Sequence, residues 1–232
     1  MCGITGIWAP GNDDGRNRAE VANAVEALRH RGPDDNGTWS DGSGVAFGHT
    51  RLSILDLSIA GHQPMTSADG RYVIVYNGEF YNFAEIRTTL VNAGHTFSGT
   101  GDTEVILAAF MEWGAGAVER MIGMFAFALW DTQEKTLQLF RDRVGVKPLY
   151  FGWDGKILCF GSELKSLRAY SHWSPEIDRE ALGEYLQYGY VAGDRTIHAG
   201  IYKLKPGHRL TLSQGQNPVI TPYWSVLDTF HD

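Results

Sequence analysis

The chain has 232 residues, of which 43% are hydrophobic, and its formal net charge is −7 with neutral histidines. This length and apolar fraction predict a globular protein with one large or two modest domains. The acidic balance, with no basic cluster longer than Arg29-His30-Arg31, excludes the electrostatic footprint of a nucleic-acid-binding or anionic-lipid-binding protein, so we expect small molecules or proteins as partners.

The N-terminus reads Met1-Cys2-Gly3-Ile4, and the apolar run from Ile4 to Trp8 predicts a buried strand. Removal of Met1 would leave Cys2 with both a thiol and a free α-amine. Because the ordinary pKa values are about 8.5 for a thiol and about 7.7 to 8.0 for an α-amine, the amine can take the thiol proton near neutral pH. A Met-Cys start is also an ordinary accident of translation, but a strand fixes this residue as a nucleophile requires. We therefore predict a cysteine nucleophile in a mature form that lacks Met1.

Strand-like runs and amphipathic helices follow along the chain. We predict strands at 45–52, 72–76, 124–131, 136–140, 150–153 and 157–160, and helices at 18–28, 103–113 and 179–188. Residues 132–135 and 154–155 are hairpin-length connections, so the strands that they join should be antiparallel. Antiparallel strands with segregated helices indicate an α+β layered sandwich, and no dinucleotide-binding or P-loop motif follows a strand.

The last part of the sequence, from residue 204, becomes rich in Pro, Gly and polar residues. We therefore expect a folded domain over residues 1–211 and a tail over 212–232 that leads toward another part of the protein. The two cysteines, Cys2 and Cys159, have neither a disulfide framework nor a metal-ligand spacing, which fits a reducing compartment. Cys159 lies in an apolar run and should be a buried small hydrophobe. Without a membrane-length apolar stretch or signal peptide, a cytoplasmic protein is expected.

A predicted strand ends at Arg51, whose planar guanidinium can bind a carboxylate through two hydrogen bonds. An arginine at this place is also typical of a surface ion pair, and the sequence leaves both interpretations open. His30, His49 and His62 have no ligand spacing and are interpreted as structural, so a Cys-His dyad is the weaker mechanism.

The segment from Tyr76 to Asn82 contains Asn77-Gly78, which is a strong hairpin signal. However, Asn82 and Glu85 have the spacing of a helix N-cap and its capping-box partner, so a helix should begin near residue 83. Too few residues then remain for a returning strand. The alternative is a strand end that presents the Asn77 amide and the Gly78 N–H, which together could hold the oxyanion of an acyl-transfer intermediate.

Asp102 opens the helix predicted at 103–113 and would serve as an ordinary N-cap. Together with Arg51 it also offers a pair of opposite charges, which suits a zwitterionic amino acid. The sequence gives no distance between the two residues.

Taken together, these segments closely resemble the glutamine-hydrolysing domain of class II amidotransferases of the asparagine synthetase type. The resemblance covers nearly the whole chain and rests on the motifs at residues 1–4, 29–34, 49–54, 61–65, 76–82, 101–104, 123–131, 141–150, 161–165 and 205–208. It implies a four-layer αββα sandwich of antiparallel sheets with an N-terminal nucleophile.

The resemblance also implies roles for individual residues. Cys2 would attack the side-chain amide of glutamine and form a γ-glutamyl thioester with release of ammonia, while Asn77 and Gly78 hold the oxyanion. Arg51 would bind the substrate carboxylate and Asp102 its α-amine. The implied glutamine-binding residues are Arg51, Ile54, Leu55, Asn77, Gly78, Glu79 and Asp102.

Further implications concern cofactors and partners. An asparagine synthetase continues into a second domain with a Ser-Gly-Gly-x-Asp-Ser loop, which this sequence lacks, so ATP and Mg²⁺ are expected only in that synthetase domain and no cofactor or metal in this chain. Ammonia would pass to the synthetase domain, in cis or in trans, to amidate aspartate. Another carboxylate acceptor, in sugar or peptide modification, stays open, as do a hydrolase for a different amide, a non-catalytic docking module and a homodimer.

Overall fold

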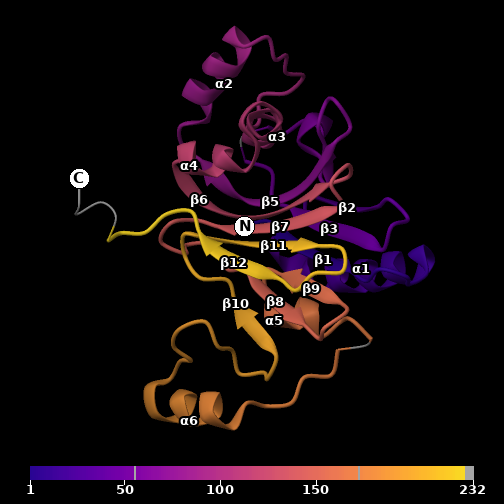
Figure 1. Ribbon diagram of the computed structural model, residues 1–232, viewed down its shortest axis with the longest axis vertical. Helices are drawn as coiled ribbons and strands as arrows, with labels where there is room; N and C mark the ends of the chain where they lie inside the picture. The colour runs from indigo at the N-terminus through magenta and orange to yellow at the C-terminus, as the bar shows by residue number, and fades with distance from the viewer. Residues whose placement is uncertain (55, 172, 228–232) are drawn as a thin grey trace.

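The computed structural model describes residues 1–54, 56–171 and 173–227. Two six-stranded antiparallel sheets lie face to face with helices on their outer sides (Figure 1). The strand order is β10-β8-β9-β1-β3-β2 in the first sheet and β12-β11-β7-β6-β5-β4 in the second. The strands are β1 Gly3–Trp8, β2 Asp35–Ser40, β3 Val45–Arg51, β4 Met65–Thr66, β5 Tyr72–Phe80, β6 Gly123–Asp131, β7 Thr136–Arg141, β8 Tyr150–Trp153, β9 Leu158–Gly161, β10 Ile201–Lys203, β11 His208–Ser213 and β12 Val219–Pro222.

Helices cover both outer faces because each presents an apolar side to a sheet. Val21 and Val25 of α1 pack with Ile7 of the first sheet, whereas Ile106 and Phe110 of α3 belong to the core over the second sheet. This four-layer arrangement confirms the predicted α+β sandwich. The helices are α1 Asp14–Leu28, α2 Phe83–Asn92, α3 Asp102–Trp113, α4 Ala117–Arg120, α5 Leu164–Leu167 and α6 Arg179–Tyr188.

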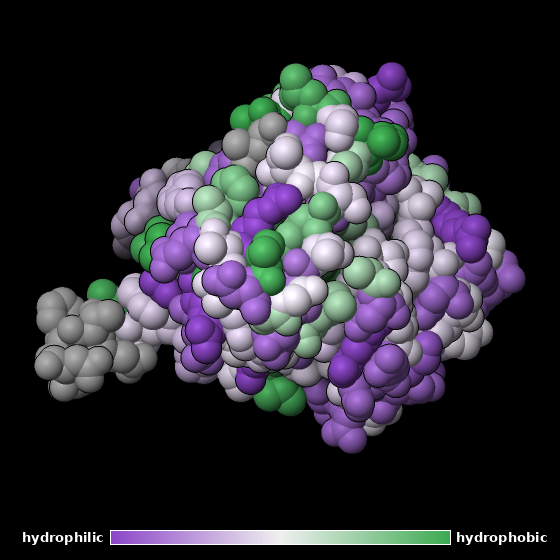
Figure 2. All heavy atoms as spheres, turned by 90° about the horizontal axis from the view of Figure 1, so that it is seen from above, coloured by the Kyte–Doolittle hydropathy of each residue, from purple (hydrophilic) through white to green (hydrophobic). Residues whose placement is uncertain are grey.

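The outer surface of the α2 and α3 layer is mostly hydrophilic. Seen from that side, hydrophobic residues lie singly or in small separate groups (Figure 2). Val91 on α2, for example, is half exposed. Scattered apolar residues of this kind are ordinary on protein surfaces. The apolar residues of this layer therefore lie mainly underneath the helices, against the second sheet.

Side-chain alternation along three strands determines what faces the space between the sheets. Ile4 of β1, Phe47 of β3 and Val75 of β5 all belong to the core between the sheets. Because successive side chains point to opposite faces, residues two positions further along each strand share that direction. Asn77 continues this inner face of β5, and His49 continues that of β3. Polar residues thus enter the inner space at one end of the sandwich.

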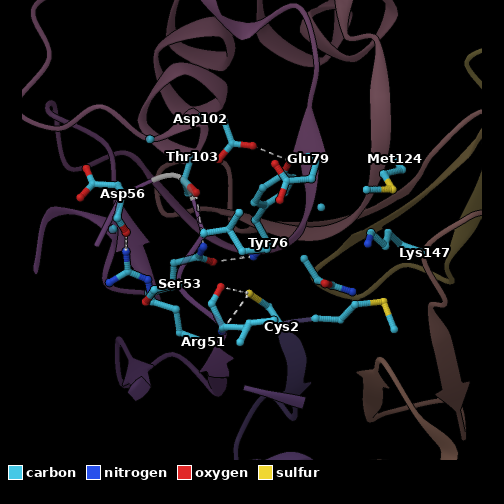
Figure 3. A pocket seen from close by; sticks show the side chains of 18 residues that line it. Cys2, Arg51, Ser53, Asp56, Tyr76, Glu79, Asp102, Thr103, Met124 and Lys147 are labelled. Atoms are coloured by element: carbon cyan, nitrogen blue, oxygen red, sulfur yellow. Dashed lines mark hydrogen bonds between the residues drawn. The ribbon is translucent and has the colours of Figure 1, made fainter. Parts of the chain in front are cut away.

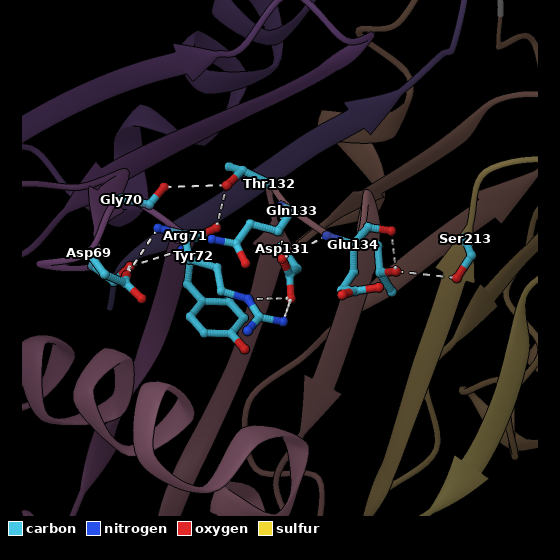
Figure 4. A network of polar contacts seen from close by, with 11 residues as sticks. Asp69, Gly70, Arg71, Tyr72, Asp131, Thr132, Gln133, Glu134 and Ser213 are labelled. Atoms are coloured by element: carbon cyan, nitrogen blue, oxygen red, sulfur yellow. Dashed lines mark hydrogen bonds and ion pairs between the residues drawn. The ribbon is translucent and has the colours of Figure 1, made fainter.

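The opposite end of β5 is closed by a polar network, where the start of this strand lies beside the end of β6 and the turn into β7 (Figure 4). Arg71 donates from Nε and Nη2 to Oδ2 of Asp131, at 3.0 and 2.7 Å. Oδ1 of Asp131 accepts the backbone N–H groups of Gln133 and Glu134, each at 3.0 Å. The Thr132 hydroxyl and backbone N–H both donate to the carbonyl oxygen of Arg71. Charged and backbone groups at this end therefore satisfy one another.

The predicted strands and helices are all present, with shifted ends. Strand β5 runs to Phe80, beyond the predicted end at residue 76, and α1 begins at Asp14. The short edge strands β2, β4, β10 and β12 were not predicted, because few of their residues form an alternating apolar pattern. Strands β11 and β12 continue the second sheet across residue 211, and the division into a domain and a tail stays a prediction.

Asn82 caps α2 as predicted, but its side chain does not bond to the helix N-terminus. Its Oδ1 accepts the N–H of Ile122 and its Nδ2 donates to the carbonyl oxygen of Arg120, at 2.8 and 3.1 Å. The capping box with Glu85 was therefore wrong, because the side chain joins α2 to the chain before β6 instead.

Candidate active site

A pocket of about 270 Å³ opens where β1 begins and where β3 and β5 end, and every predicted site residue that the structure describes lines it. These residues are Cys2, Arg51, Ile54, Asn77, Gly78, Glu79 and Asp102. Leu55, also predicted, lies outside the described residues. Figure 3 shows Arg51 and Asp56 on one side of Cys2, and Met124 and Lys147 on the other. The topology thus brings together residues as far apart in sequence as Cys2 and Lys147.

Cys2 lies directly before β1, and its thiol is largely shielded from water. Burial raises the pKa of the thiol, although the neighbouring Leu52 backbone and the amine of Met1 oppose this effect. The N–H of Leu52 lies 3.4 Å from Sγ, and Sγ donates to the Leu52 carbonyl oxygen at 3.7 Å. Arg31, which sequence reasoning did not assign to the site, donates from Nε to the Cys2 carbonyl oxygen at 2.9 Å. The thiol is protonated near neutral pH and needs a base to become a nucleophile.

Asn77 and Gly78 offer two N–H donors at the pocket. Asn77 is 1% exposed, and its Nδ2 has no hydrogen-bond partner within the described residues. A Cβ on Gly78 would lie 2.5 Å from the backbone oxygen of Met124, so only glycine fits here. The two donors therefore lie where a buried oxygen could accept hydrogen bonds from both.

Asp102 is the first residue of α3 rather than its cap, which is Gly101. Its Oδ2 instead accepts the hydroxyl of Tyr76 at 2.8 Å and the N–H of Phe80 at 3.1 Å. Burial raises the pKa of this carboxyl, even though the hydrogen bonds oppose the increase. The N-cap prediction was wrong because the carboxylate points to β5 and to the pocket.

Arg51 is buried, so the surface ion pair considered from sequence is excluded. Its Nη1 donates to the carbonyl oxygen of Ser58 at 2.8 Å, and its Nη2 donates to that of Asp56. The Asp56 carboxylate in turn accepts the N–H of Thr100 at 3.0 Å. Within the described residues, two of the five guanidinium N–H donors thus hold the loop after β3, and the others can serve a ligand.

Glu79 and Lys147 extend the pocket on its other side. Burial raises the pKa of the Glu79 carboxyl, and the negative charge of Asp102 adds to this effect. Lys147 is buried and was not predicted from the sequence. Its backbone N–H donates to Asp142, a fully buried carboxylate that also accepts the N–H of Phe125. The motif at residues 141–150 is the sequence signal that could have pointed to Lys147, because it combines charged residues with the segment Gly-Val-Lys-Pro at 145–148.

The histidines interpreted as structural lie outside the pocket lining. His30 contacts Glu163 at 3.0 Å, and His62 contacts Asp35 at 2.7 Å. Cys159 is fully buried, which confirms its interpretation as a small hydrophobe. Within the described ranges, no group of three or more His, Cys, Asp and Glu side chains could hold a metal ion. None of the helices in those ranges has the length and apolar character to cross a membrane.

Known proteins are similar to this chain over all or nearly all of its length. A family model described as a glutamine amidotransferase domain matches residues 1–224. Asparagine synthetase [glutamine-hydrolyzing] 3 of Bacillus subtilis is 39% identical over 235 residues, which are 100% of this chain and 38% of that protein. A putative asparagine synthetase [glutamine-hydrolyzing] of Mycobacterium tuberculosis is 40% identical over 97% of this chain and 37% of its own length. The chain thus spans less than two fifths of these relatives.

Two further similarities are more distant. Amidase chry2 of Gibberella zeae is 34% identical over 97% of this chain and 34% of its own length. Among solved structures, glutamine phosphoribosylpyrophosphate amidotransferase of B. subtilis superimposes with a TM-score of 0.71 at 18% identity. That match covers 96% of this chain and 49% of the solved chain. At this identity the structural match supports the fold alone.

Proposed function

The chain belongs to the glutamine amidotransferase family, and we propose that it hydrolyses the side-chain amide of glutamine to glutamate and ammonia. The observation that supports this most is the meeting of one thiol and two N–H donors in a single pocket, from Cys2, Asn77 and Gly78. A thiol can attack an amide carbon, and the donors can stabilise the negative oxygen that forms.

The reaction begins with Met1 removed, so that the α-amine of Cys2 is free to act as the base. The amine takes the thiol proton, and Sγ attacks the amide carbon. The tetrahedral oxyanion accepts hydrogen bonds from Asn77 Nδ2 and Gly78 N. The intermediate collapses as the amine returns the proton to the leaving nitrogen, which departs as ammonia and leaves a thioester. Water then attacks the thioester carbon while the amine accepts a proton from that water. The C–S bond breaks, the amine returns the proton to Sγ, and glutamate and the free thiol form.

Glutamine would lie with its α-ammonium group near Asp102 and its α-carboxylate near Arg51. The Arg51 N–H donors that have no partner among the described residues, together with the buried carboxylate of Asp102, support this orientation. Ile54 lines the pocket beside them, and Glu79 provides a second carboxyl. The role of the backbone at Leu55 remains part of this proposal.

The ammonia is proposed to serve an ATP- and Mg²⁺-dependent synthetase domain, in cis or in trans, that amidates aspartate. The relatives from B. subtilis and M. tuberculosis, which are named as asparagine synthetases, support aspartate as the acceptor. Another acceptor is the alternative, because the relative amidase chry2 is not named as an asparagine synthetase. Two free thiols support a reducing compartment such as the cytoplasm. The presence of Cys2, Arg51, Asn77 and Asp102 argues against a non-catalytic docking module.

The test is glutamate release from glutamine by the purified chain, after intact mass confirms that Met1 is absent. We expect glutamate from the wild type, none from Cys2→Ala, and little hydrolysis of asparagine, whose side chain is one methylene shorter. Cys159→Ser is the matched control, because this thiol is buried away from the pocket. A folded, processed wild type that releases no glutamate would contradict the proposal.

A further inference from the structure

Strand β5 has an open edge next to the pocket. Its neighbour β4 pairs only with Val73 and Ile74, and backbone groups further along that edge need other partners. In an antiparallel strand, the N–H groups of alternate residues point to the same edge. The N–H groups of Tyr76, Gly78 and Phe80 therefore face the open edge together.

Side chains occupy the positions on either side of Gly78. Oε1 of Gln63 accepts the N–H of Tyr76 at 2.7 Å, and Oδ2 of Asp102 accepts the N–H of Phe80 at 3.1 Å. The N–H of Gly78, between them, is left facing the pocket. Side chains thus replace a neighbouring strand everywhere along this stretch except at the proposed oxyanion donor.

His49 contacts the backbone carbonyl oxygen of Tyr76. It is 1% exposed, and its Nε2 lies 3.1 Å from the Tyr76 carbonyl oxygen. A carbonyl oxygen can only accept, so Nε2 carries the proton and Nδ1 is bare. Burial lowers the pKa of His49 to about 4, which keeps the ring neutral near pH 7. The ring is therefore a fixed donor to the peptide group that joins Tyr76 to Asn77.

Gln63 contacts the backbone N–H of the same residue, Tyr76. Its side chain is 5% exposed, and its Nε2 donates to the hydroxyl of Thr103 at 3.3 Å. Thr103 belongs to α3 and follows Asp102, whose carboxylate accepts the Tyr76 hydroxyl. The backbone N–H, the backbone carbonyl and the hydroxyl of Tyr76 are consequently all fixed by buried side chains.

We infer that His49 and Gln63 are positioning residues that clamp Tyr76, so that the next two donors, Asn77 Nδ2 and Gly78 N, converge on one oxyanion. This inference rests on the proposed function. The clamp acts on the peptide bond directly before Asn77, and a displacement of about 1 Å at a reacting centre can cost about 10²-fold in rate. His49 does not line the pocket, so its effect is transmitted through Tyr76.

The test compares His49→Leu with His49→Gln in the processed chain. Leucine removes the donor, whereas the glutamine Nε2 can replace the imidazole N–H. We expect His49→Leu to lower kcat for glutamine hydrolysis about 10²-fold with KM within about twofold, and His49→Gln to restore most of the activity. Alkylation of Cys2 by iodoacetamide should proceed at the wild-type rate in both variants, because displacement of iodide forms no oxyanion.

The possible results separate the inference from the proposed function. If His49→Leu hydrolyses glutamine at the wild-type rate, changes KM alone, or loses alkylation in parallel with hydrolysis, the clamp is wrong. If His49→Leu does not fold, Gln63→Leu decides by the same kcat and alkylation measurements, and KM is left out because Gln63 itself lines the pocket. A processed wild type that releases no glutamate overturns the proposed function and the inference with it. An active wild type with unaffected variants overturns the inference alone.

Discussion

The polar groups at the two ends of strand β5 differ in whether they have hydrogen-bond partners. At the Tyr72 end, Arg71 and Asp131 pair with each other, and the Ser67 hydroxyl accepts the N–H of Tyr72 at 2.9 Å. At the other end, Asn77 Nδ2 is buried without a partner among the described residues, and Gly78 N faces an edge without a strand. We call the Tyr72 end, where these polar groups are paired, the closed end of the strand. We call the Asn77 and Gly78 end the open end.

Because of this difference, the polar groups of the closed end contribute to stability, whereas those of the open end are available for binding a ligand. A buried donor without a partner costs about 1–3 kcal/mol, so the open end weakens the fold unless a ligand supplies an acceptor. The closed end uses similar groups to fasten two strands. Removal of the unpartnered side chain at the open end should therefore reduce activity and spare stability, and removal of a paired side chain at the closed end should do the reverse.

The largest effect is expected for Asn77→Leu. Loss of one oxyanion donor lowers kcat about 10²- to 10³-fold, while removal of an unpartnered buried amide leaves the melting temperature equal to or above that of the wild type. Glutamate release and thermal unfolding measure the two quantities.

Asn82→Leu is the matched control for that substitution, because Asn82 lies outside the pocket and its amide is fully engaged with Arg120 and Ile122. It should lose stability and keep kcat. The comparison fails if Asn77→Leu lowers stability as much as Asn82→Leu does, or if both variants keep the wild-type kcat.

Gly78→Ala should lower kcat about 10²-fold and also destabilise the protein by about 1–3 kcal/mol. The added methyl group would meet backbone atoms of Met124 and Phe125 on β6, so the two strands must move apart. Urea unfolding and steady-state kinetics test this. Gly70→Ala is a useful reference: its methyl group meets nothing within 4 Å, although its positive φ adds strain, so it should affect stability only. Wild-type kcat in Gly78→Ala would show that the donor is not used.

At the closed end, Asp131→Ala should reduce the free energy of unfolding by about 1–3 kcal/mol and leave kcat unchanged. The substitution leaves Arg71 and the N–H groups of Gln133 and Glu134 without their acceptor. Chemical denaturation gives the stability, and glutamate release under native conditions gives kcat. A large loss of kcat in the folded variant would mean that the two ends are coupled.

The smallest effect concerns pH. Although burial opposes ionisation, hydrogen bonds from Arg71 and from two backbone N–H groups hold the pKa of Asp131 below its ordinary value. A carboxyl with a lowered pKa in the folded state stabilises the protein above its unfolded pKa of about 3.9 and loses this contribution as the pH falls through the folded value. The stability difference between wild type and Asp131→Asn should be constant from pH 7 to 5 and shrink below about pH 4. A difference that stays constant down to pH 2 would contradict this.

The sequence was sufficient to predict the layered fold and seven of the residues that line the pocket, because alternating strands and dense motifs carry local information, but it did not predict Lys147. It could not predict which polar atoms remain unpartnered. That property depends on the register of β5 against β4 and β6, and on His49 and Gln63, which lie on other segments. The same limit explains why the N-cap interpretation of Asp102 was wrong. The residue follows a helix-start pattern locally, but Tyr76 and Phe80 supply its hydrogen-bond partners.

The most direct test of the account is the amide NMR spectrum of the processed chain before and after Cys2 is alkylated by 6-diazo-5-oxo-L-norleucine, a glutamine-like diazoketone. The ketone oxygen of the adduct takes the place of the substrate oxygen. We predict downfield shifts of the Gly78 N–H and the Asn77 side-chain protons, with the Tyr72 N–H at the closed end unchanged. Complete alkylation of Cys2 by mass, without any shift at Gly78 or Asn77, would contradict the claim that the open end of β5 holds the oxyanion.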